Sequence, residues 1–246
     1  MKGNMQARMI LLALLMGAAT LYSFLVPPAA GFREPNMARI IFFHLPSAFV
    51  ASVMIIAIGW LGITVLRRRD AISDIRLAAA TELGMIFALA TMATGIVFSR
   101  VQWGAWWQND PRQVSFLVVC LMLLAGTALR AGIADDTKRA LASGAYSVAM
   151  LVPAIFLTFV YPRLEAVREK SFHPSQTIQT GGFDTAYWIG ILVIFLLLLV
   201  ITRWLYLMRI RIGTLELELI NGIQPDHRRS AAPDGVVRPV ALHEES

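Results

Sequence analysis

The sequence predicts an all-α, polytopic membrane protein: a bundle of six transmembrane helices with its functional loops on the outer face. Of its 246 residues, 57% are apolar and only 15% are charged, and the mean hydropathy is +0.63. A soluble domain carries about 25% charged residues, and a soluble chain of this length could not solvate its surface with so few. The same composition excludes a disordered chain, a coiled coil and collagen.

Six segments are apolar over the length that a spanning helix needs, about 20 residues. They are residues 9–26, 46–66, 78–98, 114–133, 141–161 and 185–207. An even number of spans places both termini on one side of the membrane. We therefore expect a membrane domain over residues 1–208, which includes an outer tryptophan-rich loop at 99–112. We expect residues 209–246 to form a cytoplasmic tail that is disordered in part.

The first two segments begin differently. Segment 9–26 could be a signal peptide cleaved near Pro28-Ala29-Ala30, but its apolar run exceeds the usual length of about 7–15 residues and favours an uncleaved helix. The second segment starts at Pro46, and proline suits the first turn of a helix. A helix over 46–66 would measure about 31 Å at about 1.5 Å per residue, close to one hydrocarbon thickness.

The later segments carry signals of their own. The third follows the run Arg67-Arg68-Arg69, and the fourth comes after the tryptophan-rich loop. The fifth contains Pro153, which we expect to kink it. The sixth has Trp188 and Trp204 near its two ends, as in an aromatic belt at the membrane interfaces.

The positive charges set the orientation. Of 22 lysines and arginines, 15 lie on the side of the termini, the 67–77 loop and the 134–140 loop, and seven lie on the other side. The positive-inside rule makes both termini cytoplasmic. In a soluble protein the net charge of +6 would suggest a nucleic acid partner. Here the uneven distribution of positive charge between the two sides of the membrane is explained by topology, and we expect no nucleic acid partner.

The loop between the third and fourth segments is dense in tryptophan. Trp103, Gly104, Trp106 and Trp107 fall within five residues, and an i, i+3, i+4 spacing would put the three indoles on one face of a helical turn. One interpretation is an aromatic belt at headgroup depth. The other is an aromatic platform for a large planar ligand, with offset contacts worth about 0.5–1.5 kcal/mol each. Its charged frame favours the platform: Arg100, Asp110 and Arg112.

Two of the four histidines lie on the same outer side. His44 stands just before the second segment, and His173 lies in the 162–184 loop. A lone histidine is usually a hydrogen-bonded or solvated side chain, but two beside one aromatic cluster fit the needs of non-covalent haem. The imidazoles would be axial ligands of the haem iron, and Arg100 and Arg112 would contact the propionates or a partner.

Other metal chemistry fits less well. The outer loops offer too few clustered histidines and carboxylates for a zinc site. Cys120 is the only cysteine, which excludes an intrachain disulfide, a cysteine-based zinc site and covalent haem at a Cys-x-x-Cys-His motif.

With these residues the chain resembles the cytochrome c maturation protein C family (CcmC, haem exporter protein C), haem-handling proteins with a WWD domain. The resemblance covers about residues 8–208. His173 occupies the loop of the family's second histidine, and residues 44–48, His-Leu-Pro-Ser-Ala, match the family's H-V-P-x-A. The family's loop, approximately W-G-x-W-W-x-W-D-x-R, is matched by Trp103, Gly104, Trp106, Trp107, Asp110 and Arg112.

The chain departs from the family pattern at three positions. Asn109 replaces a further tryptophan, which removes one ring from the platform. Gln113 and Val114 replace the usual Leu-Thr. None of these departures touches the two histidines.

The resemblance implies a function in cytochrome c biogenesis. Members hold non-covalent haem b at the periplasmic face of the bacterial inner membrane, with two histidines, here His44 and His173, as axial ligands and the WWD loop against the porphyrin. They deliver haem to the periplasmic haem chaperone CcmE, in a complex with the ABC transporter CcmA/CcmB and the small membrane protein CcmD. The resemblance thus implies a haem-delivery protein in contact with membrane lipid, and not an enzyme.

Three alternatives differ from this interpretation. A CcsA-type cytochrome c synthase needs more spans and a second histidine pair inside the membrane, and a membrane cytochrome b holds haem between histidines within the bilayer. No histidine falls within the six predicted segments, which counts against both. A secondary transporter should show paired broken helices and ionisable groups at the midplane, and apart from Pro153 these are missing.

Overall fold

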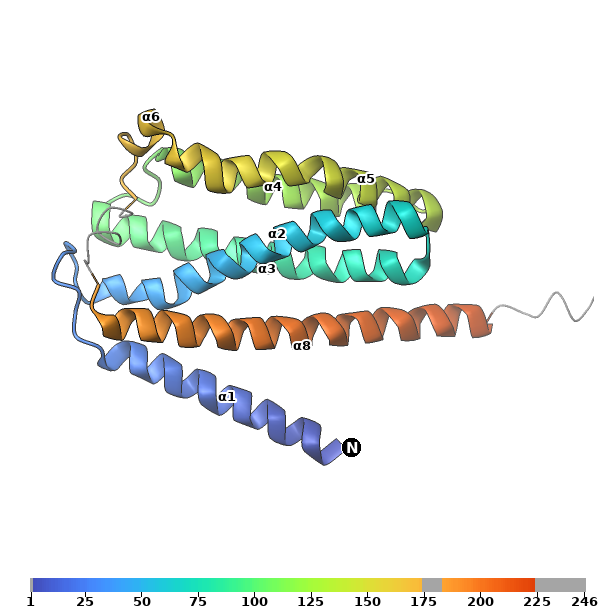
Figure 1. The fold of residues 1–246 in the computed structure, drawn as a ribbon, viewed down its shortest axis with the longest axis horizontal. Coiled ribbons are helices and arrows are strands. Elements are labelled where there is room, and N and C mark those ends of the chain that lie inside the picture. The colour runs from blue at the N-terminus through green and yellow to red at the C-terminus, as the bar shows by residue number, and fades with distance from the viewer. Residues whose placement is uncertain (1, 174–182, 224–246) are drawn as a thin grey trace, which may run out of the picture.

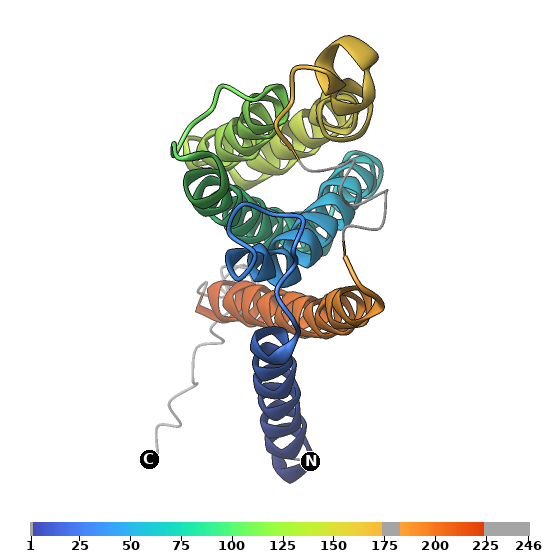
Figure 2. The same ribbon diagram turned by 90° about the vertical axis from the view of Figure 1, so that its left-hand side faces the viewer.

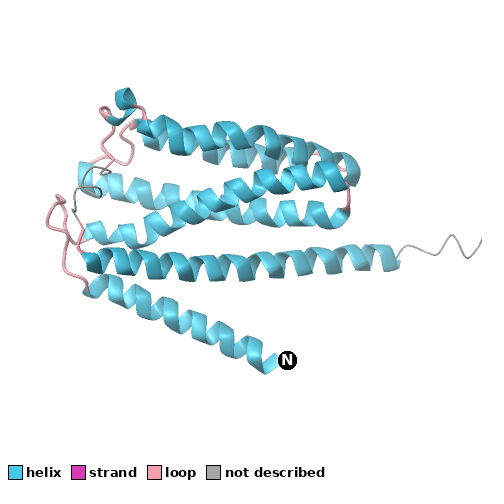
Figure 3. Cartoon of the chain, in the orientation of Figure 1, coloured by secondary structure: helices cyan, strands magenta, loops and turns pink. Residues whose placement is uncertain are grey.

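Six long helices run back and forth along one direction in the computed structural model, which describes residues 2–173 and 183–223 (Figure 1). The described residues form helices and loops and no strand (Figure 3). The long helices are α1 (Lys2–Leu25), α2 (Ile41–Arg68), α3 (Ala71–Trp103), α4 (Pro111–Ala131), α5 (Asp136–Ile155) and α8 (Thr185–Ile223). Short elements connect them: η1 (Met37–Ile40), η2 (Phe156–Val160), η3 (Tyr161–Arg163) and α6 (Glu165–Arg168).

The prediction of an all-α, multi-pass membrane protein is confirmed. Six helical stretches are long and apolar enough to cross a membrane, and each contains most of one of the predicted segments. The helices extend past those segments. At about 1.5 Å per residue the 39 residues of α8 measure about 58 Å, about twice the hydrocarbon thickness of about 30 Å. The helix α8 continues without a break past residue 208, where we expected the tail to begin.

The expected 67–77 loop is a tight turn of two residues. Arg69 ends α2 in the left-handed conformation with φ 53°, and its N–H donates to the Val65 carbonyl over 2.9 Å. Asp70 then begins α3, because its carboxylate accepts the Ser73 N–H at 2.8 Å and caps the first turn. Polar residues thus extend the helix that hydropathy alone would start at residue 78.

Two ion pairs tie α3 to its neighbours. Asp74 accepts two hydrogen bonds of 2.6 Å from the Arg130 guanidinium of α4, a bidentate arrangement that offsets the burial of the carboxylate. Glu82 pairs with Arg209 of α8, with its oxygens 2.7 and 2.9 Å from the guanidinium nitrogens. Asp74 lies in the first turn of α3, and Glu82 lies about two turns further along the helix.

The helix α2 begins at Ile41, so the expectation that Pro46 opens it is wrong. Pro46 is the sixth residue of the helix, past its first turn, so it leaves the Phe42 carbonyl without the usual donor four residues on. Tertiary packing holds the additional turn: Phe42 is fully buried and stacks on Tyr187 of α8 with ring centroids 4.8 Å apart. His44 consequently lies within the helix and not before it.

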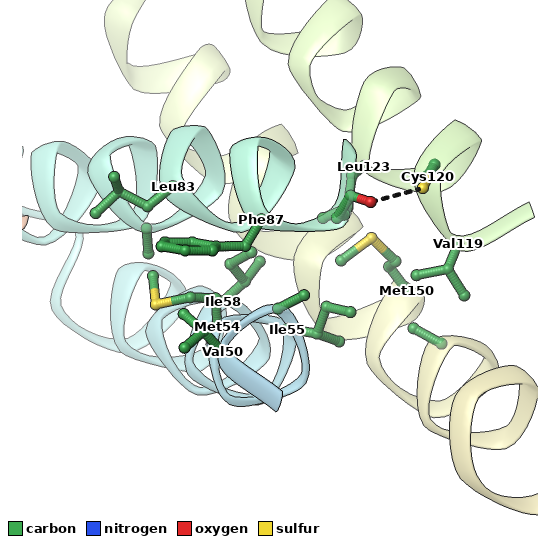
Figure 4. Packing of buried hydrophobic residues seen from close by; sticks show 14 of the residues in the cluster. Val50, Met54, Ile55, Ile58, Leu83, Phe87, Val119, Cys120, Leu123 and Met150 are labelled. Carbon is green, nitrogen blue, oxygen red and sulfur yellow. Dashed lines mark hydrogen bonds between the residues drawn. The ribbon is translucent and has the colours of Figure 1, made fainter. Parts of the chain in front are cut away.

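The helix α2 is the centre of the bundle and packs most extensively against α3 and α5. Apolar side chains of α2, α3, α4 and α5 form the main core (Figure 4). Small residues allow α2 and α5 to approach closely, as is common between helices in membranes. A Cβ atom on Gly62 would lie only 2.8 Å from the Gly144 carbonyl oxygen.

The helices α1 and α8 stand to one side of this core. In Figure 2, α8 lies between α1 and the α2–α3 pair, and in Figure 1 α1 diverges from the bundle toward its N-terminus. Residues 26–40, 104–110 and 156–173 meet at one end of the bundle, which we call the loop end. The start of α1 and the end of α8 lie at the opposite end, as an even number of spans requires.

Candidate functional site

A cavity of about 270 Å³ opens at the loop end. Its walls come from η1, α2, α3, the start of α4, the segment after α5 and the 171–173 loop; no described residue of α1 or α8 lines it. Most of the lining is apolar, which is usual for ligand pockets, and a few polar groups face inward. His44 and His173 both line this one cavity, although they lie far apart in the chain.

The proton arrangement of His44 follows from its contact with Thr94. His44 Nδ1 lies 2.9 Å from the Thr94 hydroxyl. That hydroxyl also lies 2.7 Å from the Ala90 carbonyl oxygen and 3.0 Å from that of Thr91, so its single proton is donated to a carbonyl. In the tautomer with Nδ1–H, this hydroxyl accepts from the ring and Nε2 carries the lone pair, the form in which imidazole binds a metal.

Gly95 gives the His44 ring its space. A Cβ atom at position 95 would lie 3.2 Å from His44 Cε1, closer than an ordinary van der Waals contact. The Thr94-Gly95 pair on α3 thus supplies the hydrogen-bond partner and the room for one imidazole.

His173 is half-buried and neutral. Burial, the positive charge of Arg112 and the His44 ring together lower its pKa to about 4, with burial the largest cause and Asp110 opposing them. The His44 ring is among the groups that lower the pKa of His173, so the two rings lie within electrostatic reach. Neutral imidazole is the ligand form of histidine, so both rings are suited to a metal held in the cavity.

The three indoles do not share one face, contrary to the spacing argument. Helix α3 ends at Trp103, because Gly104 takes φ 85° and terminates it. Trp103 lines the cavity and packs edge-on against Phe98, with ring centroids 5.3 Å apart. Trp106 is 59% exposed on the outside, and Trp107 donates its indole N–H to Asn109 Oδ1 at 2.8 Å.

Asn109 has a structural reason to replace a tryptophan here. Its φ is 51°, in the left-handed region that asparagine tolerates better than most residues. The next residue, Asp110, caps α4. The loop therefore has a left-handed residue near each end, Gly104 and Asn109.

Of the two arginines expected at the site, only one lines the cavity. Arg100 donates to the Gly104 carbonyl, lies 5.9 Å from the Trp106 ring centroid, and does not line the cavity. Arg112 does line it, and its Nη2 donates to the Pro162 carbonyl at 2.9 Å. Arg163 also lines the cavity, and sequence reasoning placed it on the outer side without assigning it a role.

The structure thus brings together His44, His173, Trp103, Asp110 and Arg112, and leaves Arg100, Gly104, Trp106 and Trp107 outside the cavity wall. Sequence reasoning missed Thr94, Gly95 and Thr158. The first two sit inside an apolar segment, where nothing in the sequence separates them from packing residues. Thr158 reaches the cavity because α5 ends in the π-helical turn η2, a feature frequent at functional sites.

Comparison with known proteins gives the family. A model described as Heme exporter protein C matches residues 1–222. The Heme exporter protein C of Rhodobacter capsulatus is 32% identical over 133 residues, which are 54% of this chain and 53% of that protein. That of Paracoccus denitrificans is 29% identical over 140 residues, 55% and 54% of the two chains.

The relative in Escherichia coli K12, also named Heme exporter protein C, is 25% identical over 136 residues, 55% of this chain and 54% of that protein. The chain spans about half the length of these curated relatives. Because the family model covers nearly all of the chain, including both histidines and the tryptophan loop, the chain belongs to the Heme exporter protein C family.

Proposed function

We propose that this protein holds haem b non-covalently at the loop end, with His44 and His173 as axial ligands, and delivers it to a periplasmic haem chaperone of the CcmE type. The observation that carries the proposal is the convergence of the two histidines on one mostly apolar cavity, with the Thr94 hydroxyl beside the His44 ring and the pKa of His173 lowered to about 4. The relatives are named as haem exporters, which agrees with haem as cargo and not as a reactant to be transformed.

The cavity fits haem held partly outside it. Its volume of about 270 Å³ lies just below the range of about 300–1,000 Å³ for pockets that enclose a ligand. Because haem must leave the protein again, a site that covers only one part of the porphyrin suits it. Trp103 and Phe98 offer ring surfaces for that part, and Arg112 and Arg163 offer positive charge for propionates.

We infer the orientation from charge. The positive-inside rule puts the termini in the cytoplasm and the loop end in the periplasm, with residues 1–208 in the membrane domain. CcmA/CcmB and CcmD are the proposed partners in the inner membrane. Residues 209–223 of the proposed tail continue α8, and residues 224–246 lie outside the described part of the chain.

Copurification with the chaperone tests the function. We expect haem to be found first on this protein and then on the chaperone when the two are mixed in detergent. An electron-transfer cytochrome b would instead keep its haem and change only its redox state. Haem that stays fully on this protein in the presence of active CcmA/CcmB would contradict haem delivery.

Thr94→Val should weaken haem binding. The valine keeps the shape but removes the acceptor for His44 Nδ1–H, and loss of such a supporting contact typically costs about 10–100-fold in metal affinity. Thr94→Ser is the matched control because it keeps the hydroxyl. Haem titration of the purified variants measures the affinity, and equal affinities for valine and serine would show that the hydroxyl has no part in ligation.

Trp103→Ala and Trp106→Ala should separate two roles of the loop. Trp103 lines the cavity, and we expect its alanine variant to lose haem during purification. Trp106 is 59% exposed, and its variant should keep haem but transfer less of it to the chaperone. The measurements are haem content by pyridine extraction and haem recovered on the chaperone; haem loss of the same size in both variants would contradict this division.

A further inference from the structure

Asp110 joins the tryptophan loop to the segment that carries His173. Its side chain is only 4% exposed. Oδ1 accepts the backbone N–H of Arg112 at 2.8 Å and that of Gln113 at 3.4 Å, which caps α4. Oδ2 accepts the Ser171 hydroxyl at 2.9 Å and the Phe172 N–H at 2.5 Å.

Ser171 links Asp110 to His173 through two hydrogen bonds. Its hydroxyl proton is donated to Asp110, and its oxygen accepts the backbone N–H of His173 at 3.2 Å. Residues 171, 172 and 173 are therefore all fixed, directly or through one hydroxyl, to a single carboxylate. The short helix α6 before them has only four residues and supplies little rigidity of its own.

We propose that Asp110 is a positioning residue for the haem ligand His173, acting through Ser171 and Phe172. This inference rests on the proposed ligand role of His173. The sequence pattern grouped Asp110 with residues that stack on haem, but the five hydrogen bonds described for its carboxylate go to the α4 N-terminus and to the 171–172 segment.

Both carboxylate oxygens of Asp110 are needed as hydrogen-bond acceptors. A buried carboxylate is costly unless hydrogen bonds and positive charge offset its desolvation, and here several donors and the positive end of α4 do so. An asparagine has one acceptor oxygen, so it could keep either the α4 cap or the Phe172 contact. Arg112, two residues on, holds the other end of the segment through the Pro162 carbonyl.

Three variants separate positioning from helix capping. Asp110→Asn removes one acceptor. Ser171→Ala removes the hydroxyl that links Asp110 to the backbone of His173, while leaving the α4 cap and the Phe172 contact intact. Asp135→Asn is the matched control, because Asp135 caps α5 through the Lys138 N–H at 2.7 Å and does not line the cavity.

The first measurement needs no haem. Hydrogen exchange of a peptide containing Phe172 and His173 is expected to accelerate about tenfold or more in Asp110→Asn, as loss of a charge-assisted hydrogen bond predicts. The peptide should exchange faster in Ser171→Ala too and be unchanged in Asp135→Asn. Unchanged exchange in both site variants would overturn the inference whatever the cargo is.

The second measurement uses the haem-loaded protein. We expect Asp110→Asn and Ser171→Ala to convert part of a six-coordinate, low-spin haem spectrum to five-coordinate, high-spin, and added imidazole to restore it. Combining Asp110→Asn with His173→Ala should lower haem affinity no further than His173→Ala alone. If His173→Ala itself leaves the spectrum unchanged, the proposed ligand fails; if it alters the spectrum and the two site variants do not, only the positioning role fails.

Discussion

The double variant His44→Ala, His173→Ala is expected to purify without haem. Both axial nitrogens are removed, and loss of one supporting contact already costs about 10–100-fold in metal affinity, so the loss of both ligands should lower affinity by at least about a hundredfold. The remaining contacts would be Trp103, Phe98 and the cavity arginines. Haem per protein, measured by pyridine extraction and by the absorbance spectrum, reports the result.

The two histidines of the proposed tail provide the matched control. His227→Ala, His243→Ala removes the same number of imidazoles from residues outside the described part of the chain, and its haem content should equal that of the unchanged protein. Added imidazole should return part of the haem to the His44→Ala, His173→Ala variant, which would show that the cavity itself is intact. Full haem retention by that variant would rule out both ligands.

Gly62→Leu should cause the largest loss of stability among single substitutions discussed for the fold. Its Cβ would lie 2.8 Å from the Gly144 carbonyl oxygen and 2.9 Å from Ser147 Cβ, so backbone must move. Overpacking typically costs about 1–3 kcal/mol and more where the neighbour cannot yield, so we expect a loss of about 3 kcal/mol. Since α2 carries His44 and α5 leads into the cavity wall, haem binding should fall as well.

Gly17→Leu is the control for this substitution. Gly17 lies in α1, where a Cβ atom would meet nothing within 4 Å, and the variant should stay within about 1 kcal/mol of the unchanged protein. Unfolding in mixed micelles of increasing denaturing detergent measures both free energies. Equal losses in the two variants would contradict close α2–α5 contact as the cause.

Hydropathy predicts that the six long helices exist, but it does not predict where each one begins and ends. Apolar length predicts all six spans, because a bilayer demands it. The ends depend on local contacts that a hydropathy window averages away: the cap at Asp70, the left-handed Arg69, and the Phe42–Tyr187 stack that starts α2 early. Ion pairs between helices likewise cannot be predicted from one sequence: Asp74 pairs with Arg130, which lies 56 positions away.

The candidate site was partly predictable for a similar reason. Rare residue types on one face pointed to His44, His173, Trp103, Asp110 and Arg112, which do meet at one cavity. The i, i+3, i+4 spacing of the indoles failed because Gly104 ends the helix. Thr94 could not be found, since its importance arises only from a 2.9 Å contact with a ring 50 positions earlier.

The absence of α1 and α8 residues from the cavity wall also bears on the order of synthesis. The described lining residues lie between positions 40 and 173, and α8 begins only at Thr185. At about 5–20 residues per second, the ribosome needs a further ~2–8 s to make the 39 residues of α8. The nascent chain thus contains every one of these wall residues before α8 is made. What α8 then adds is support from outside the wall, because Tyr187 stacks on Phe42 and holds the first turn of the helix that carries His44.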